Sequence, residues 1–186
     1  MKTSVKYGLF FGLIWIIIDM IIFYAGFAKG AFIPMILINL FFLMSAISVG
    51  LYLTKKERNW EKGIFADDFK IAMQGGIIYA VLIAAFIYLY HAQIDTSIRD
   101  SLIDARIEAL HEAVPDAETY KELQAEDPTW QDKSYDDYIE NQEDQIAGVI
   151  SPTSIFVMHL MGLSMLAFLY SFGAAIIIRK VVLRGM

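Results

Sequence analysis

Three polar side chains lie inside long apolar stretches of this chain: Asp19, Asn39 and His159. An ionisable group inside a membrane costs a few kcal/mol, and by default it indicates a functional site. A carboxylate beside an imidazole could hold or move a proton, and the three groups could contact a lipid head group. Counting residues from the ends of the stretches puts all three roughly 10–12 Å below the same surface. We therefore expect an intramembrane polar layer that is a candidate binding site.

The same three residues have a simpler interpretation. Polar side chains on neighbouring membrane helices often form hydrogen bonds that fix register, each contributing less than ~1 kcal/mol. Asp19, Asn39 and His159 could serve only this structural purpose.

Four apolar stretches must position these residues, at about 5–28, 31–53, 71–92 and 153–178. Each is near or above the ~20 residues that cross a bilayer. A hydrophobic fraction of 57% and a mean hydropathy of +0.50 agree with this, and 186 residues suffice for one compact bundle. We expect an all-α, polytopic membrane protein, with a four-transmembrane-helix bundle as a single membrane domain over 1–186.

The first stretch also resembles a signal peptide. Lys2 and Lys6 precede it, and Gly26 and Ala28 look like a small-residue cleavage site. Its apolar run is longer than that of a signal peptide and contains Asp19, so we expect a retained helix.

Lys and Arg gather on one side of the stretches. The positive-inside rule places short basic segments in the cytoplasm. We therefore expect cytoplasmic N- and C-termini in a bacterial inner membrane. The basic residues are Lys2 and Lys6, then Lys55, Lys56, Arg58, Lys62 and Lys70 in the link, and Arg179, Lys180 and Arg184 in the tail.

The long connection at 93–150 is acidic and accounts for the net charge of −6. Its charge argues against nucleic acid as a partner. Apolar residues at Ile94, Ile98 and Leu102 indicate an amphipathic helix, which we expect to continue the third span until Pro115. A short helix at about 116–126 should follow.

Two further sequence patterns predict where helices begin near the end of this connection. Ser134 with Asp137 forms a capping-box pattern for a helix to about residue 146, and Ser151-Pro152 should start the last span. We expect a folded extracytoplasmic helical cap between helices 3 and 4. The alternative is a charged mobile loop. A folded cap could pack on itself through Tyr135 and Tyr138, against a partner, or along the lipid interface.

Small residues spaced four apart occur in every span and favour close helix packing. They are Gly8 and Gly12, Ala46 and Gly50, Gly76 and Ala80, and Ala167 and Ser171.

No catalytic, phosphate-binding or metal motif is present, and the chain has no cysteine. Asp67 and Asp68 suit the opening turn of the third span, where the helix dipole favours carboxylates, better than a metal site. We expect no cofactor, no metal and no enzymatic activity.

Two segments carry a resemblance to a known family. They are Gly63-Ile64-Phe65-Ala66-Asp67-Asp68-Phe69-Lys70 before the Gly-rich third span, and Ser171-Phe172-Gly173-Ala174-Ala175-Ile176-Ile177-Ile178-Arg179-Lys180 at the end of the fourth. Together with the Lys-rich link and the acidic insertion, they resemble DUF4199, a family of small membrane proteins typical of Bacteroidota. The family's usual Gly-Phe-Lys is Asp68-Phe69-Lys70 here.

The resemblance implies four helices in the inner membrane, and it brings no activity or catalytic residue. It suggests a membrane glycosyltransferase acting on polyprenyl phosphate as a partner. We expect a non-catalytic accessory or scaffolding subunit that packs against a membrane partner or a second copy of itself. The alternative is a binding or transport module for a lipid head group or proton at Asp19, Asn39 and His159.

Overall fold

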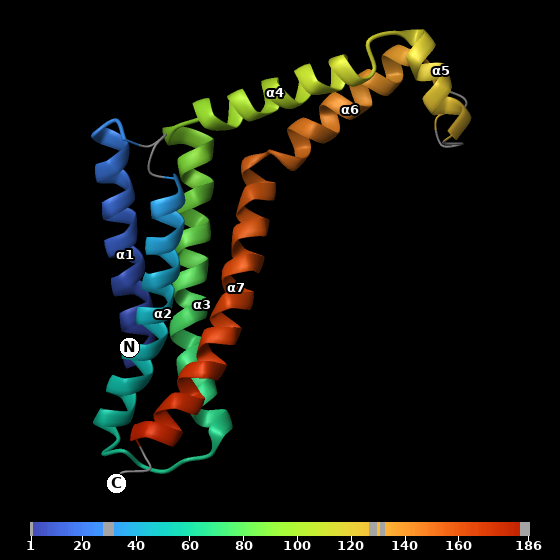
Figure 1. Ribbon diagram of the computed structural model, residues 1–186. Helices are drawn as coiled ribbons and strands as arrows, with labels where there is room; N and C mark the ends of the chain where they lie inside the picture. The colour runs from blue at the N-terminus through green and yellow to red at the C-terminus, as the bar shows by residue number, and fades with distance from the viewer. Residues whose placement is uncertain (1, 28–31, 127–129, 131–132, 183–186) are drawn as a thin grey trace. The chain divides into compact units, whose positions relative to one another are not determined.

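The computed structural model describes residues 2–27, 32–126, 130 and 133–182. Among these residues every long element is helical and no strand occurs (Figure 1). The elements are α1 (Thr3–Tyr24), α2 (Phe32–Glu57), α3 (Phe65–Leu89), the π-helical turn η1 (Tyr90–Ile94), α4 (Ser97–Ala113), α5 (Ala117–Glu126), α6 (Tyr135–Val149), α7 (Pro152–Ile177) and the π-helical turn η3 (Ile178–Val182).

Within the described part of the chain, four helical segments are long and apolar enough to cross a membrane: Thr3–Tyr24, Ile33–Glu57, Phe65–Ile94 and Pro152–Val181. This confirms the expected all-α membrane protein with four spanning helices. The end of the first expected span, at residue 28, and the start of the second, at residue 31, lie outside the described residues.

The second and third helices are longer than expected at the ends joined by the basic link. Lys55 and Lys56 form the last turn of α2, and Asp67 and Asp68 form the first turn of α3. These charges match the helix dipole, which favours cations at a C-terminus and anions at an N-terminus. The helices therefore extend beyond their apolar stretches.

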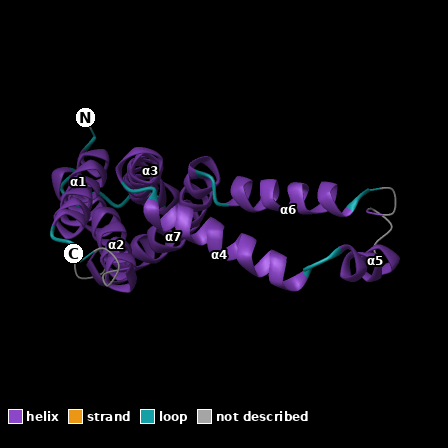
Figure 2. Cartoon of the chain, turned by 90° about the horizontal axis from the view of Figure 1, so that it is seen from above, coloured by secondary structure: helices purple, strands orange, loops and turns teal. Residues whose placement is uncertain are grey.

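The chain divides into two compact units. One unit comprises Met1–Phe86 and Val157–Met186, and the other comprises Ile87–Phe156. The first unit, called the bundle below, contains α1, α2 and most of α3 and α7. Figure 2 looks along the helices of the bundle.

The core of the bundle contains side chains that recur at helical spacing along α2 and α3. Leu43, Ile47 and Leu51 of α2 are almost fully buried, as are Tyr79 and Ile83 of α3. Residues four apart share one face of a helix, so each helix turns a single stripe inward.

In the second unit, α4 and α6 lie side by side (Figures 1 and 2). The expected break at Pro115 is present, because α4 ends at Ala113 and α5 starts at Ala117. The expected capping box is also present: the Ser134 hydroxyl accepts from the Asp137 N–H, and the Asp137 carboxylate accepts from the Ser134 N–H. These two predictions are confirmed.

Tyrosine side chains hold α5 to the start of α6. Tyr120 is 2% exposed and packs against Tyr135 and Tyr138, with ring centroids 6.1 and 4.9 Å apart. Its hydroxyl donates to the carbonyls of Trp130 and Lys133 at 3.2 Å. The described helices of this insertion therefore pack on one another.

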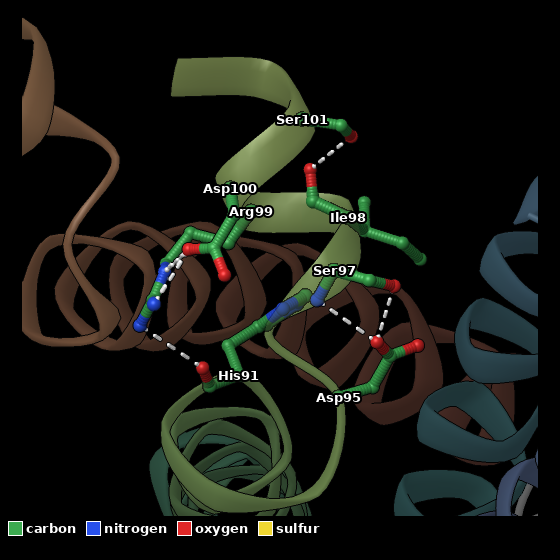
Figure 3. A network of polar contacts seen from close by, with 7 residues as sticks. All are labelled: His91, Asp95, Ser97, Ile98, Arg99, Asp100 and Ser101. Atoms are coloured by element: carbon green, nitrogen blue, oxygen red, sulfur yellow. Dashed lines mark hydrogen bonds and ion pairs between the residues drawn. The ribbon is translucent and has the colours of Figure 1, made fainter. Parts of the chain in front are cut away.

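The expectation that α4 continues the third span is wrong. Asp95 has extended backbone (φ −140°, ψ 99°) and separates the η1 turn from α4 (Figure 3). Its carboxylate accepts from the Ser97 N–H at 3.0 Å and from the Ser97 hydroxyl. An Asp that bonds the backbone two residues later forms a turn that competes with helix. The Asp95-Thr96-Ser97 sequence carried this signal.

Two further contacts stabilise the start of α4 (Figure 3). The Arg99 guanidinium donates to the carbonyl of His91 at 3.3 Å and to the Asp100 carboxylate at 2.6 Å. Its hydrogen bond to Asp100 is the main cause that lowers the pKa of this carboxyl.

Candidate functional site

Asn39 is the most buried of the three polar residues predicted to form a layer. The hydroxyl of Tyr79 lies 3.0 Å from Asn39 Oδ1 and 3.1 Å from the Asn39 carbonyl oxygen. Tyr79 is fully buried, so this contact satisfies a phenol inside the bundle. Asp19 is half-buried on α1, and His159 is exposed on α7.

The register of α1 and α2 places Asp19 and Asn39 at different depths. The two helices are antiparallel (Figure 1), and the Trp15 indole N–H points to the Met35 carbonyl at 3.4 Å. Phe11 packs against Phe42, with ring centroids 5.9 Å apart, and a Cβ atom at Gly50 would lie 3.1 Å from the Ser4 Cα. Asn39 is therefore about level with Trp15, which lies four residues before Asp19, or roughly 6 Å along the helix. This separation differs from the equal depths obtained by counting residues.

Three cavities of the bundle are lined by residues other than Asp19, Asn39 and His159. A binding or transport role for these three residues stays a prediction. Asn39 has a structural partner, Tyr79, which the sequence did not single out.

The eight small residues predicted to form helix contacts are all buried: Gly8, Gly12, Ala46, Gly50, Gly76, Ala80, Ala167 and Ser171. A Cβ atom at Gly8 would lie 2.5 Å from the Gly75 carbonyl oxygen, and one at Gly76 would lie 2.8 Å from the Ala167 Cβ. Both distances are shorter than carbon atoms tolerate. Helix α3 therefore approaches α1 and α7 so closely that only glycine fits.

An ionic cluster lies at the end of the bundle where α2 ends, α3 begins and the η3 turn follows α7. Asp68 is fully buried and has two cationic partners. Lys55 Nζ lies 2.5 Å from Asp68 Oδ1, and Arg179 Nη1 lies 3.0 Å from Asp68 Oδ2. The Lys55 side chain is 4% exposed and that of Arg179 is 34% exposed. The cluster joins three helical segments through one carboxylate.

The same two cations hold the link between α2 and α3. Lys55 Nζ donates to the Glu61 carbonyl at 2.9 Å, and Arg179 Nη1 donates to the Gly63 carbonyl at 2.8 Å. Asn59 and Trp60 in this link have positive φ values of 50° and 59°. Bonds from both ends of the cluster keep the turn closed despite this uncommon backbone.

Sequence reasoning placed Asp68 correctly in the first turn of α3 but missed its partners. The helix dipole explains a carboxylate in that turn but identifies no partner for it. The available signal was that Asp68 and Arg179 belong to the two segments that carry the family resemblance. The structure brings these segments into contact.

The cluster has the composition of a structural ion pair. A buried carboxylate with a lysine and an arginine has its charge compensated, and each Asp68 oxygen lies within 3.0 Å of a cationic nitrogen. Among the described residues, no group of three or more His, Asp or Glu side chains could hold a metal ion.

Comparison with models of known protein families gives a match. The family model described as "Protein of unknown function (DUF4199)" matches residues 6–180. No curated protein and no solved structure matches the chain.

Proposed function

The chain belongs to the DUF4199 family, and on this premise we propose that it is a non-catalytic subunit of the bacterial inner membrane that packs against a membrane-protein partner. The observation that carries this proposal is the outer face of α7. The resemblance noted above suggests, as the partner, a glycosyltransferase acting on polyprenyl phosphate.

Helix α7 has two distinct faces. Its buried face consists of Leu163 and small residues at Ala167, Ser171 and Ala175. Its outer face is rich in methionine and phenylalanine, with the exposed side chains Met158, Met161, Met165, Phe168, Leu169 and Phe172. Methionine is unbranched and polarisable, so it adapts to irregular protein surfaces and is common where proteins bind partners.

The outer face of α1 provides the contrast. Phe10, Leu13, Ile17 and Ile21 are exposed at similar spacing, but the stripe contains no methionine. Lipid tails need no adaptable side chain, so an aliphatic and aromatic stripe is sufficient there. The difference favours α7 as the surface that binds protein.

The ionic cluster supports a structural rather than a catalytic reading of the charged residues. Asp68 is enclosed by Lys55 and Arg179 and has no exposed surface. A general acid or base must reach a substrate. A fully buried carboxylate between two cations instead holds helix ends in place.

We place the basic end of the bundle in the cytoplasm and the acidic helices outside it. Lys55, Arg58, Lys70 and Arg179 gather where α2 ends and α3 begins, and positive charge is retained on the cytoplasmic side. The chain has no cysteine, so single-cysteine variants report topology cleanly. A membrane-impermeant maleimide should label Lys121→Cys in intact spheroplasts and Glu61→Cys only after permeabilisation.

The partner surface is tested by photocrosslinking in cells. A photoreactive phenylalanine analogue at Met165 should give a discrete crosslinked product with another membrane protein. The same analogue at Ile17, which is similarly exposed on α1, should react only with lipid. Purification in mild detergent should recover that protein in stoichiometric amount, and Met161→Ala with Met165→Ala should reduce its recovery.

Other crosslinking results would contradict the proposal. Lipid adducts alone at both positions would show that α7 faces the bilayer. A product of twice the 21.1 kDa chain mass would show that α7 contacts a second copy instead.

A further inference from the structure

Two cavities lie next to each other at the basic end of the bundle. The first is polar, has a volume of about 370 Å³, and is lined by residues that include Lys2, Arg58, Glu57 and Asp67. The second is an apolar groove of about 670 Å³ formed by residues of α1 and α3 that include Val5, Met73, Ile77 and Ile78.

The two cavities share a boundary, because three residues line both: Lys2, Lys70 and Gln74. Two ammonium groups and one amide therefore lie at the boundary between the polar cavity, called the chamber below, and the apolar groove. Among the described residues, no ion pair is recorded for Lys2 or Lys70. Their charges are available to a ligand.

The charged side chains are ordered along the direction from the groove into the chamber. The groove is apolar except at the shared boundary, which carries the two lysines. Carboxylates occur only in the chamber, where Glu57 accepts a hydrogen bond from the Thr3 hydroxyl at 2.6 Å. The order from the groove inward is hydrocarbon, then the two lysines, then a chamber that holds Glu57 and Asp67 together with Arg58.

A phospholipid with an amine in its head group has the complementary order. Its acyl chains are hydrocarbon, its phosphate is an anion, and its ammonium is a cation that donates hydrogen bonds. We infer that the two cavities form a binding site for an aminophospholipid of the phosphatidylethanolamine type. Lys2 and Lys70 bind the phosphate, Asp67 and Glu57 bind the ammonium, and an acyl chain lies along Met73, Ile77 and Ile78.

The start of α1 adds to the phosphate site. Helix α1 begins at Thr3 with no side-chain cap and no acidic residue in its first turn. Thr3 and Ser4 also line the chamber. The unpaired N–H groups of a helix start and the positive end of its dipole favour a nearby phosphate.

The carboxylates distinguish this ligand from other phospholipids. The glycerol head group of phosphatidylglycerol carries no cation, so Arg58 alone would face the two carboxylates of Asp67 and Glu57 in the chamber. A choline head group carries a cation but has no N–H to donate. The chamber therefore favours a primary ammonium. The site is separate from Asp19, Asn39 and His159, and it does not depend on the partner proposed for α7.

The test is native mass spectrometry of the full-length protein in detergent. Phosphatidylethanolamine, phosphatidylcholine and phosphatidylglycerol with identical acyl chains are titrated in turn. Phosphatidylethanolamine should bind about tenfold more tightly than the other two, the effect of one good charge-assisted contact. Free phosphoethanolamine should not displace it, because the groove contributes part of the affinity.

Three variants assign the contacts. Lys70→Gln should weaken all three lipids about tenfold, because each carries the phosphate. Asp67→Asn should weaken only phosphatidylethanolamine and so abolish the preference. Lys180→Gln is the matched control: it removes an exposed charge near the same bundle end that does not line either cavity.

Three outcomes would overturn the inference. Equal binding of the three lipids, unaffected by Lys70→Gln, would mean that they only coat the hydrophobic surface. Tighter binding of phosphatidylglycerol that increases further in Asp67→Asn would assign the site to an anionic lipid. Displacement by free phosphoethanolamine would assign the chamber to a soluble ligand. Helical circular dichroism of each variant separates loss of binding from loss of fold.

Discussion

Arg179 and Asp68 are 111 residues apart in the chain and lie in contact, with Arg179 Nη1 3.0 Å from Asp68 Oδ2. Arg179 follows α7 in the η3 turn, and Asp68 lies in the first turn of α3. Lys55 at the end of α2 completes the cluster. One carboxylate therefore connects the ends of three spans, and its neutralisation should loosen all three.

Asp68→Ala should strongly destabilise the bundle, because it leaves Lys55 buried without a counter-charge. Breaking a buried ion pair by removing one partner costs about 3–5 kcal/mol. Thermal unfolding of the purified protein in detergent measures the effect. The control is Asp67→Ala, which removes the neighbouring, exposed carboxylate and should leave the midpoint nearly unchanged.

A double variant separates charge from packing at the same place. Lys55→Met with Asp68→Leu replaces the pair by apolar side chains of similar size. It should recover most of the stability lost in Asp68→Ala, since apolar replacement of a buried pair is often neutral. Equal midpoints for Asp68→Ala and Asp67→Ala would show that the cluster contributes nothing.

Gly8→Ala should force α1 away from α3. The new methyl group would lie 2.5 Å from the Gly75 carbonyl oxygen, and backbone cannot yield as a flexible side chain does. Overpacking of this kind costs about 1–3 kcal/mol. Unfolding in detergent with increasing sodium dodecyl sulfate gives the difference.

The matched control for Gly8 is Gly162→Ala in α7. No atom lies within 4 Å of a Cβ placed at Gly162, so the added methyl group has room. This variant should be neutral or slightly stabilising, because alanine favours helix. If both variants behave alike, the close approach of α1 and α3 does not depend on glycine.

Tyr79→Phe should weaken the contact between α2 and α3. It removes the hydroxyl that binds Asn39 and leaves the amide without that donor. Hydrogen bonds between membrane helices contribute about 0.6 kcal/mol on average, with a maximum near 1.7. A double-mutant cycle with Asn39→Ala should return a coupling energy in that range.

Asp19→Asn and His159→Ala serve as comparisons in the Tyr79 experiment. If Asp19, Asn39 and His159 act together as a binding layer, each variant should alter retention of the same bound lipid or proton uptake. If only Tyr79 and Asn39 are coupled, the polar residues act as separate structural contacts.

The acidic helices should lose stability in acid. Hydrogen bonds from the backbone and hydroxyl of Thr119 lower the pKa of Asp116, and those from Ser134 lower the pKa of Asp137. A lowered pKa means that the folded state binds fewer protons than the unfolded state. The stabilisation is therefore complete above the unfolded pKa of about 3.9 and is lost as pH falls through the folded pKa values.

Fluorescence of Trp130 can follow this acid transition. Its ring packs edge-on against Tyr138 at 4.9 Å. In a Trp15→Phe, Trp60→Phe background the emission should shift as pH falls below about 4. Asp137→Asn should weaken the signal's pH response. An emission spectrum that is constant from pH 6 to pH 3 would show that these carboxylates do not control the fold.

The sequence by itself determined what depends on composition and near neighbours. The length of the apolar runs determined four spans, since a bilayer requires about 20 apolar residues for each helix. Ser134 with Asp137 started α6, and Ser151 capped α7, because caps act within three residues. The Asp95 turn is equally local, but the apolar periodicity around it suggested an unbroken helix.

Only the tertiary structure decided which polar groups meet. The sequence presented Asp68 as a helix-start charge and Asn39 as one of a layer of three, but packing paired them with Arg179 and Tyr79. Contacts across 111 and 40 residues depend on helix register and rotation, which periodicity alone leaves open. In this bundle the close approach at Gly8 and Gly76 sets both, because backbone that touches backbone leaves a helix little freedom to slide or turn.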